Sequence, residues 1–225
     1  ISSLQKVPFD TNRLRDQIPS GIAVLSALTE LNINTNVITG SLPSEMAGMT
    51  ALADINVGYT ILEGSVPTLL CGLTGLTKLN MEYCRYGGSL PSCLVQLTAL
   101  VGMYLGHNEI SGPIPAQAGS MVALREFKLN YNERITGTIP SSLCNMSALE
   151  LMDFTSQIAL FINRVTGPLP AALGQLLLVE KLYLSVNRFS GTIPATLPAL
   201  PVLTVLGIST NLLSGPLPAS SWSAR

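Results

Sequence analysis

Histidine is almost absent from this chain of 225 residues, because His107 is the only one. A Ser/His/Asp or Cys/His catalytic arrangement would depend on this single side chain. No glycine-rich phosphate loop is present, since the glycines recur as turn residues at one place in a repeated phrase. The sequence therefore predicts a protein that is not an enzyme and that carries no cofactor.

Cysteine is also scarce, with four residues and no C-x-x-C pair among them. Zinc sites are typically built from such pairs, and only one histidine is available to complete a cluster. Four cysteines are also too few for a fold that depends on disulfides. We therefore expect no metal site.

Charge and long apolar runs are the other two shortages. Charged residues make up 11% of the chain, and 12 basic residues are balanced by 13 acidic ones for a net charge of −1. A net charge so close to zero gives no reason to expect a basic surface that binds nucleic acid. Residues 189–224 carry no charge, yet proline, glycine, asparagine and many Ser/Thr residues interrupt them. No membrane span is expected within this segment.

The main feature of the chain is a sequence repeat of 24 residues, here called a phrase, which ends in an Ile/Leu/Val-Pro pair. Nine prolines in one register indicate nine coils of a solenoid, in which each coil packs only against its neighbours. These prolines are Pro19, Pro43, Pro67, Pro91, Pro115, Pro140, Pro170, Pro194 and Pro218.

Each phrase opens with apolar residues at positions 1, 4 and 6, as in Leu28, Leu31 and Ile33. Because positions 4 and 6 alternate with polar ones, they should point inward from a short strand while positions 3 and 5 point outward. Adjacent coils should then pair as a parallel sheet. The phrases start 24 residues apart, except for one spacing of 25 and one of 30, at Leu4, Leu28, Leu52, Leu76, Leu100, Leu124, Leu149, Val179 and Leu203.

This pattern resembles the leucine-rich-repeat signature L-x-x-L-x-L-x-x-N-x-L. Its ends, such as Ile38-Thr39-Gly40-Ser41-Leu42-Pro43, resemble the plant-type subclass, L-[ST]-G-x-[IL]-P. Similar repeats occur in plant receptor-kinase ectodomains, polygalacturonase-inhibitor-like proteins and surface proteins of algae and protists.

The resemblance implies an α/β solenoid, a right-handed superhelical horseshoe of about nine 24-residue coils. A parallel β-sheet would line the concave face, with short second strands and 3₁₀ segments on the convex side. We expect residues 1–225 to form a single domain of this kind. Uncapped ends would expose core leucines, so the segment is expected to be a fragment whose caps lie outside it, or one capped by Phe9 and Trp222.

Position 9 carries asparagine in most coils, where its amide can satisfy backbone groups that turn inward after the strand. Thr60 and Cys84 replace it in two coils, where we expect the ladder of hydrogen bonds made by the position-9 side chains to be weaker. On the convex side, Cys71 and Cys93 lie one coil apart. A disulfide between them and two buried free thiols are equal alternatives from the sequence, and Cys144 is expected to be unpaired.

One coil carries a longer insertion, residues 155–162, with several large apolar side chains. We expect it to fold back over the edge of the sheet. If it were exposed, it would be a candidate interaction loop.

Function is expected on the outward strand positions, because neighbouring coils hold their backbone while leaving the side chains free. Position 8 carries a ring in four successive coils, so the middle of the concave face is predicted to be an aromatic recognition patch of mixed charge. The alternative is that the tyrosines stack on the strand surface without any ligand. The candidate binding residues are Tyr59, Tyr83, Tyr104, His107, Lys128, Tyr131, Asp153 and Tyr183.

Asn145-Met146-Ser147 is an N-x-S acceptor for glycosylation on a return segment. Since plant-type repeats are mostly extracellular, the resemblance favours a secreted or cell-surface glycoprotein. The leading hypothesis is a receptor-like module that binds a protein or peptide through the concave face, with carbohydrate as a second candidate ligand. A structural or adhesive wall or surface protein, and a glycan- or ice-binding protein, remain as alternatives.

Overall fold

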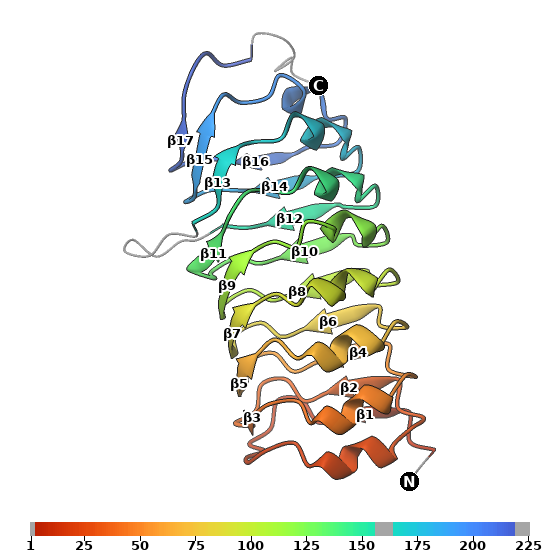
Figure 1. The fold of residues 1–225 in the computed structure, drawn as a ribbon. Coiled ribbons are helices and arrows are strands. Elements are labelled where there is room, and N and C mark those ends of the chain that lie inside the picture. Colours follow the sequence, from red (N-terminus) through yellow and green to blue (C-terminus); the bar gives the residue numbers. More distant parts are fainter. Residues whose placement is uncertain (1–2, 156–163, 219–225) are drawn as a thin grey trace.

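The computed structural model describes residues 3–155 and 164–218, in which nine coils are stacked along one axis (Figure 1). Each coil contributes one strand to a parallel sheet whose order follows the sequence. Neighbouring strands pair without slipping, so that Leu31 lies opposite Ile55 and Ile55 opposite Leu79. The predicted solenoid is therefore confirmed. Its nine strands are β1 (Lys6–Pro8), β2 (Glu30–Asn32), β4 (Asp54–Asn56), β6 (Lys78–Asn80), β8 (Gly102–Tyr104), β10 (Glu126–Lys128), β12 (Leu151–Asp153), β14 (Lys181–Tyr183) and β16 (Val205–Gly207).

Short second strands follow the inward turn in every coil but the first, as the plant-type pattern predicts. One sheet contains β3 (Thr39–Gly40), β5 (Ile61–Ser65), β7 (Arg85–Ser89), β9 (Glu109–Pro113) and β11 (Arg134–Thr136). The other contains β13 (Thr166–Pro168), β15 (Arg188–Gly191) and β17 (Leu212–Leu213). The N–H of Thr166 donates to the carbonyl of Gly137 at 2.7 Å, so backbone bonds continue between the two sheets. The expected folding back of the insertion concerns residues outside the described part, apart from Thr155.

The return side of each of the first eight coils contains one 3₁₀ turn (Figure 1). The prolines that mark the repeat stand just before most of these turns: the carbonyl of Pro43 accepts from the N–H of Met46 at 3.0 Å. This i to i+3 bond defines the 3₁₀ turn, and proline costs nothing there because its missing N–H is not needed. The turns are η1 (Ser20–Val24), η2 (Ser44–Gly48), η3 (Thr68–Gly72), η4 (Ser92–Gln96), η5 (Ala118–Ser120), η6 (Ser141–Asn145), η7 (Ala171–Gln175) and η8 (Leu197–Ala199).

The core runs between these layers as one continuous column of apolar side chains. In a middle coil, Leu100, Leu105 and Ile110 are fully buried. At the first coil the column is open, with a cavity of about 480 Å³. Phe9 lines this cavity and is 53% exposed, so it does not close the core, and Trp222 lies outside the described residues. Among the described helical turns, none has the length and apolar character needed to cross a bilayer.

Buried asparagines tie successive coils together at position 9. Asn132 is fully buried, and its Nδ2 donates to the carbonyls of Leu105 at 2.9 Å and Leu129 at 3.0 Å. Its Oδ1 accepts from the N–H of Ile110 at 2.9 Å. These bonds satisfy backbone groups that no water can reach.

Threonine and cysteine replace this asparagine in two adjacent coils. Thr60 Oγ1 donates to the carbonyl of Val57 at 2.7 Å and lies 3.4 Å from Cys84 Sγ. A thiol is a weak hydrogen-bonding group, so these contacts agree with the weaker ladder predicted there.

Candidate binding surface on the concave face

Four aromatic rings stand in one column on the concave face, each three residues after the end of β4, β6, β8 or β10. Ring centroids are 4.3 Å apart for Tyr59 and Tyr83, 3.7 Å for Tyr83 and His107, and 3.9 Å for His107 and Tyr131. Each pair of ring planes is within 17° of parallel. We call these four side chains the aromatic ladder. The sequence predicted that they would lie together, and their stacking was expected under the alternative in which the rings bind no ligand.

All four ladder residues have a left-handed backbone, with φ between 53° and 56°. Residues with a side chain avoid this conformation unless the surrounding structure holds it. The next coil does so here, because the N–H of Tyr83 donates to the carbonyl of Gly106 at 3.1 Å and that of His107 to Asn130 at 2.9 Å. The rings are thus held in place by the fold. None of the four is Gly or Asn, so position in the repeat was the only sequence signal for this conformation.

The two middle rings of the ladder, Tyr83 and His107, offer ring edges and not ring faces. Tyr83 has one face against Tyr59 and the other against His107, yet it is 42% exposed. Its exposed area therefore belongs to the ring edge and the hydroxyl group. Burial lowers the pKa of His107, so its imidazole is neutral at pH 7. The exposed strip is accordingly uncharged and amphipathic.

Tyr104 and Lys128 form a second group beside the ladder. Lys128 Nζ lies 5.0 Å from the centroid of the Tyr104 ring and 3.7 Å from Glu126 Oε2. Gly102, on the same face of β8, leaves room for the ring, because a Cβ there would lie 2.7 Å from Tyr104 Cε2. Burial, together with Glu126, raises the pKa of Tyr104 to about 12. A cation over a tyrosine face is an attractive pair, so Lys128 is held over this ring.

A hollow of about 650 Å³ opens on the concave face over β10, β12, β14 and β16. Four of the sequence-predicted residues line it, namely Lys128, Tyr131, Asp153 and Tyr183. Sequence reasoning missed the others that matter here, which are Thr155, Ser185 and Ser209. The signal for them is position 7 of the repeat, which also faces outward. Tyr59, Tyr83, Tyr104 and His107 do not line this hollow.

The carboxyl groups of this part of the face are partly withdrawn from water. Burial raises the pKa of Glu82, and the charges of Asp153 and Glu126 act in the same direction against Lys128. Burial likewise raises the pKa of Asp153, although the N–H of Thr155 donates to its Oδ1 at 3.0 Å. A partly buried carboxylate gains from an added cation more than a fully hydrated one does.

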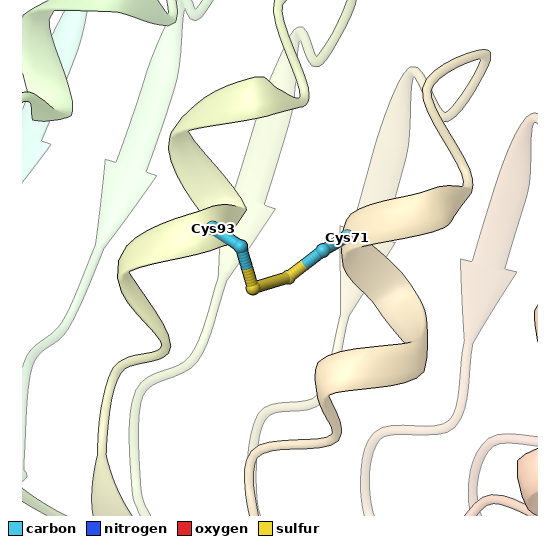
Figure 2. The surroundings of a disulfide bond; sticks show 2 residues. All are labelled: Cys71 and Cys93. Carbon is cyan, nitrogen blue, oxygen red and sulfur yellow. A yellow bond between two sulfur atoms is a disulfide. The ribbon is translucent and has the colours of Figure 1, made fainter.

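The convex side carries the remaining predicted residues. Cys71 of η3 and Cys93 of η4 form a disulfide with their Cα atoms 5.5 Å apart, which joins two neighbouring coils (Figure 2). Cys84 and Cys144 are free and buried, and burial raises the pKa of both thiols. Asn145 is exposed at the end of η6, as a glycan acceptor must be. Within residues 3–155 and 164–218, no group of three or more His, Cys, Asp or Glu could hold a metal ion.

Part of the chain matches a known family, and the whole chain is similar to several solved structures. A family model described as Leucine Rich Repeat matches residues 178–200. No curated protein matches the sequence. The chain is similar to the solved structure of a TDR receptor, with 30% identity and a TM-score of 0.89 over 96% of this chain and 36% of that one.

Two further solved structures contain bound peptides. The plant peptide hormone receptor RGFR1 in complex with RGF2 is 28% identical, with a TM-score of 0.89 over 95% of this chain and 33% of that one. The Arabidopsis receptor kinase HAESA, in complex with the peptide hormone IDA and the co-receptor SERK1, is 27% identical with a TM-score of 0.90. It is matched over 96% of this chain and 35% of that one.

A plant ice-binding protein has the same fold at 24% identity, with a TM-score of 0.74 over 97% of this chain and 74% of that one. The chain spans about a third of the length of the three receptor structures.

Proposed function

We propose that this chain, a plant-type leucine-rich-repeat protein, is a non-catalytic extracellular recognition module that binds a peptide along its concave face. The observation that carries the proposal is the aromatic ladder formed by Tyr59, Tyr83, His107 and Tyr131. Tyrosine edges and hydroxyls held in fixed positions are the groups that recognition surfaces favour.

The ladder suits an extended peptide. Its three centroid distances together cover roughly the length of three to four residues of extended chain, at about 3.3 Å per residue. Because the backbone of each coil holds the rings, little side-chain freedom is lost when a ligand is bound. The tyrosine hydroxyls can pair with the polar backbone of the peptide, while the ring edges contact its apolar side chains.

The solved structures of related proteins support this choice of ligand. RGFR1 is bound to RGF2, and HAESA to the peptide hormone IDA. Both are peptide complexes of proteins that share this solenoid. For the present chain a peptide is accordingly favoured over other classes of partner.

An extracellular location fits two features of the convex side. The Cys71–Cys93 disulfide belongs to an oxidising compartment, and the acceptor Asn145 is exposed to solvent. A glycan at Asn145 would extend from η6, on the side away from the ladder. Glycosylation would therefore leave the proposed binding surface open.

Carbohydrate and ice are weaker candidates on geometric grounds. Sugars stack on the faces of aromatic rings, but both faces of Tyr83 and His107 are covered by other rings. An ice-binding face needs a regular polar array. The exposed column at position 14 carries Ser41, Ser65 and Ser89 in three successive coils but is interrupted by Pro113 and Pro168.

The test is selection of peptides from a random dodecamer library on the folded chain, followed by fluorescence polarisation of the selected peptides. Replacing both Tyr83 and Tyr131 by alanine should weaken their binding at least about tenfold, which is the scale of a hot-spot loss. The control is Val122→Ala, because Val122 is 51% exposed beyond the end of η5, away from the ladder.

Thermal unfolding of the double variant separates recognition from stability. Binding that is lost while the unfolding midpoint shifts by no more than a few degrees supports the proposal. Binding that is unchanged in the double variant would reject it.

A further inference from the structure

The hollow beside the ladder carries a second, more specific inference, which rests on the proposed function. Tyr131 is both the last ring of the ladder and part of the wall of the hollow. A peptide that follows the ladder in this direction therefore reaches the hollow next. With a volume of about 650 Å³, the hollow has room for a long side chain.

A buried hydroxyl in the wall of the hollow makes no hydrogen bond of ordinary geometry among the described residues. Thr155 is only 7% exposed, and its Oγ1 makes no hydrogen bond among the described residues, although the Thr155 side chain is close enough to Asp153 to act to lower the pKa of that carboxyl. Its own N–H donates to Asp153 Oδ1 at 3.0 Å, so the two residues are held next to each other. A buried polar group without a partner is costly, and a ligand that supplies a donor there would remove that cost.

The charges around the hollow favour a positive ligand. The one ammonium in its wall, Lys128, lies 3.7 Å from Glu126 Oε2 and also interacts with the carboxyl groups of Glu82 and Asp153. Three carboxylates thus share one lysine. Asp153 is the one of these three that lines the hollow. Lys181 of β14 is exposed and does not line it.

An anionic ligand fits less well for the same reason. Lys128 is already engaged by Glu126 and by the ring of Tyr104, with its Nζ 5.0 Å from the ring centroid. An added negative charge would be repelled by Asp153 in the wall of the hollow, a carboxyl group that is partly withdrawn from water. A positive charge would restore the local balance.

We propose that this hollow binds a basic side chain, arginine or lysine, of the peptide that the ladder holds. The cation pairs with the carboxylate of Asp153, and one of its N–H groups donates to Thr155 Oγ1. The hydroxyl pair of Ser185 and Ser209, in which Ser209 Oγ donates to Ser185 Oγ at 3.1 Å, lies in the wall and offers further acceptor sites.

The probe is a selected dodecamer that contains arginine, compared with the same peptide in which citrulline replaces that arginine. Citrulline keeps the shape and removes the charge. On the unaltered chain the citrulline peptide should bind at least about fivefold more weakly. On the Asp153→Asn variant the two peptides should bind equally, because the interaction between the paired groups is then gone.

Two further variants sharpen the test. Thr155→Val keeps the shape of the side chain and should weaken the arginine peptide more than the citrulline peptide. Glu45→Gln removes a negative charge from η2, on the convex side, and should change neither affinity. Asparagine at position 153 keeps an acceptor for the N–H of Thr155, and the unfolding midpoint of each variant checks that the fold is intact.

The outcomes separate this inference from the proposed function. The assignment of the hollow would be overturned if the selected peptides need Tyr83 and Tyr131 but carry no basic residue. It would also be overturned if their affinity does not change in Asp153→Asn. In both cases the proposed binding of a peptide to the aromatic ladder would be unaffected. A library that yields no binding peptide would overturn both.

Discussion

The imidazole of His107 lies face to face with the ring of Tyr83 at a centroid distance of 3.7 Å, while Tyr131 covers its other face at 3.9 Å. The only histidine of the chain is thus enclosed in the surface that we propose for peptide recognition. The pKa of His107 therefore indicates whether its imidazole is enclosed between the rings of the aromatic ladder.

Acidification should destabilise the fold through His107. Burial lowers the pKa of His107 below its ordinary value of 6.5, so the folded chain binds this proton less readily than the unfolded chain. The penalty is absent above pH 6.5 and grows as the pH falls from there towards the folded pKa. Titration of the imidazole by NMR should give a value below 6.5, and the loss of stability below pH 6.5 should be smaller in His107→Gln. A titration at or above 6.5 would contradict the enclosed imidazole.

Removal of the charge of Glu82 should stabilise the chain at neutral pH. Burial raises the pKa of Glu82, so ionisation is less favourable in the folded chain than in the unfolded one. This penalty is fully present above the folded pKa and disappears as the pH falls below the ordinary value of 4.5. Glu82→Gln should therefore raise the urea midpoint at pH 7 and leave it unchanged at pH 3.5. The exposed Glu45→Gln serves as the control, and a lower midpoint for Glu82→Gln at pH 7 would count against the prediction.

Loss of the disulfide should cost about 3 kcal/mol of unfolding free energy, because a cross-link between residues 22 apart restricts the unfolded chain. Urea unfolding of the Cys71→Ser/Cys93→Ser double variant measures this cost. Dithiothreitol should lower the stability of the unaltered chain to that of the variant and have no effect on the variant itself. Free thiols at Cys71 and Cys93, detected in the unreduced folded chain, would refute the bond.

The asparagines at position 9 should contribute most to the free energy of unfolding where they are buried. Asn132→Ala leaves several buried backbone groups without partners and should cost about 3 kcal/mol. Asn12 occupies the same position in the first coil but is exposed, and its Nδ2 donates to the carbonyl of Phe9 at 3.2 Å. Asn12→Ala should cost less than about 1 kcal/mol, because water replaces the lost bonds. Equal losses of unfolding free energy for the two variants, measured in urea, would show that burial does not set the strength of these asparagine hydrogen bonds.

Most of the fold could be predicted because the repeat admits one register. Apolar residues at positions 1, 4 and 6 and proline at the end of each phrase define the coil, and equivalent positions then come into line along the sheet. Asn56 pairs with Asn80 without slipping, so Tyr59 and Tyr83 must also be neighbours. The clustering of the candidate residues follows from this alignment alone.

The details of the site depend on features that the repeat pattern does not contain. Stacking of the rings requires a left-handed backbone at residues that are neither Gly nor Asn. The hollow depends on the missing side chain of Gly207 and the small one of Ser209, which line it together with the larger Lys128 and Tyr183. Burial of Thr155 depends on how neighbouring coils pack, which one position in the sequence does not reveal.

The most direct test of the central claim is a crystal structure of the chain with a selected dodecamer bound. The peptide should lie in an extended conformation on the concave face, across Tyr59, Tyr83, His107 and Tyr131, with a basic side chain beside Asp153. A peptide bound to the convex side or to either end of the solenoid, with these rings uncovered, would contradict the claim.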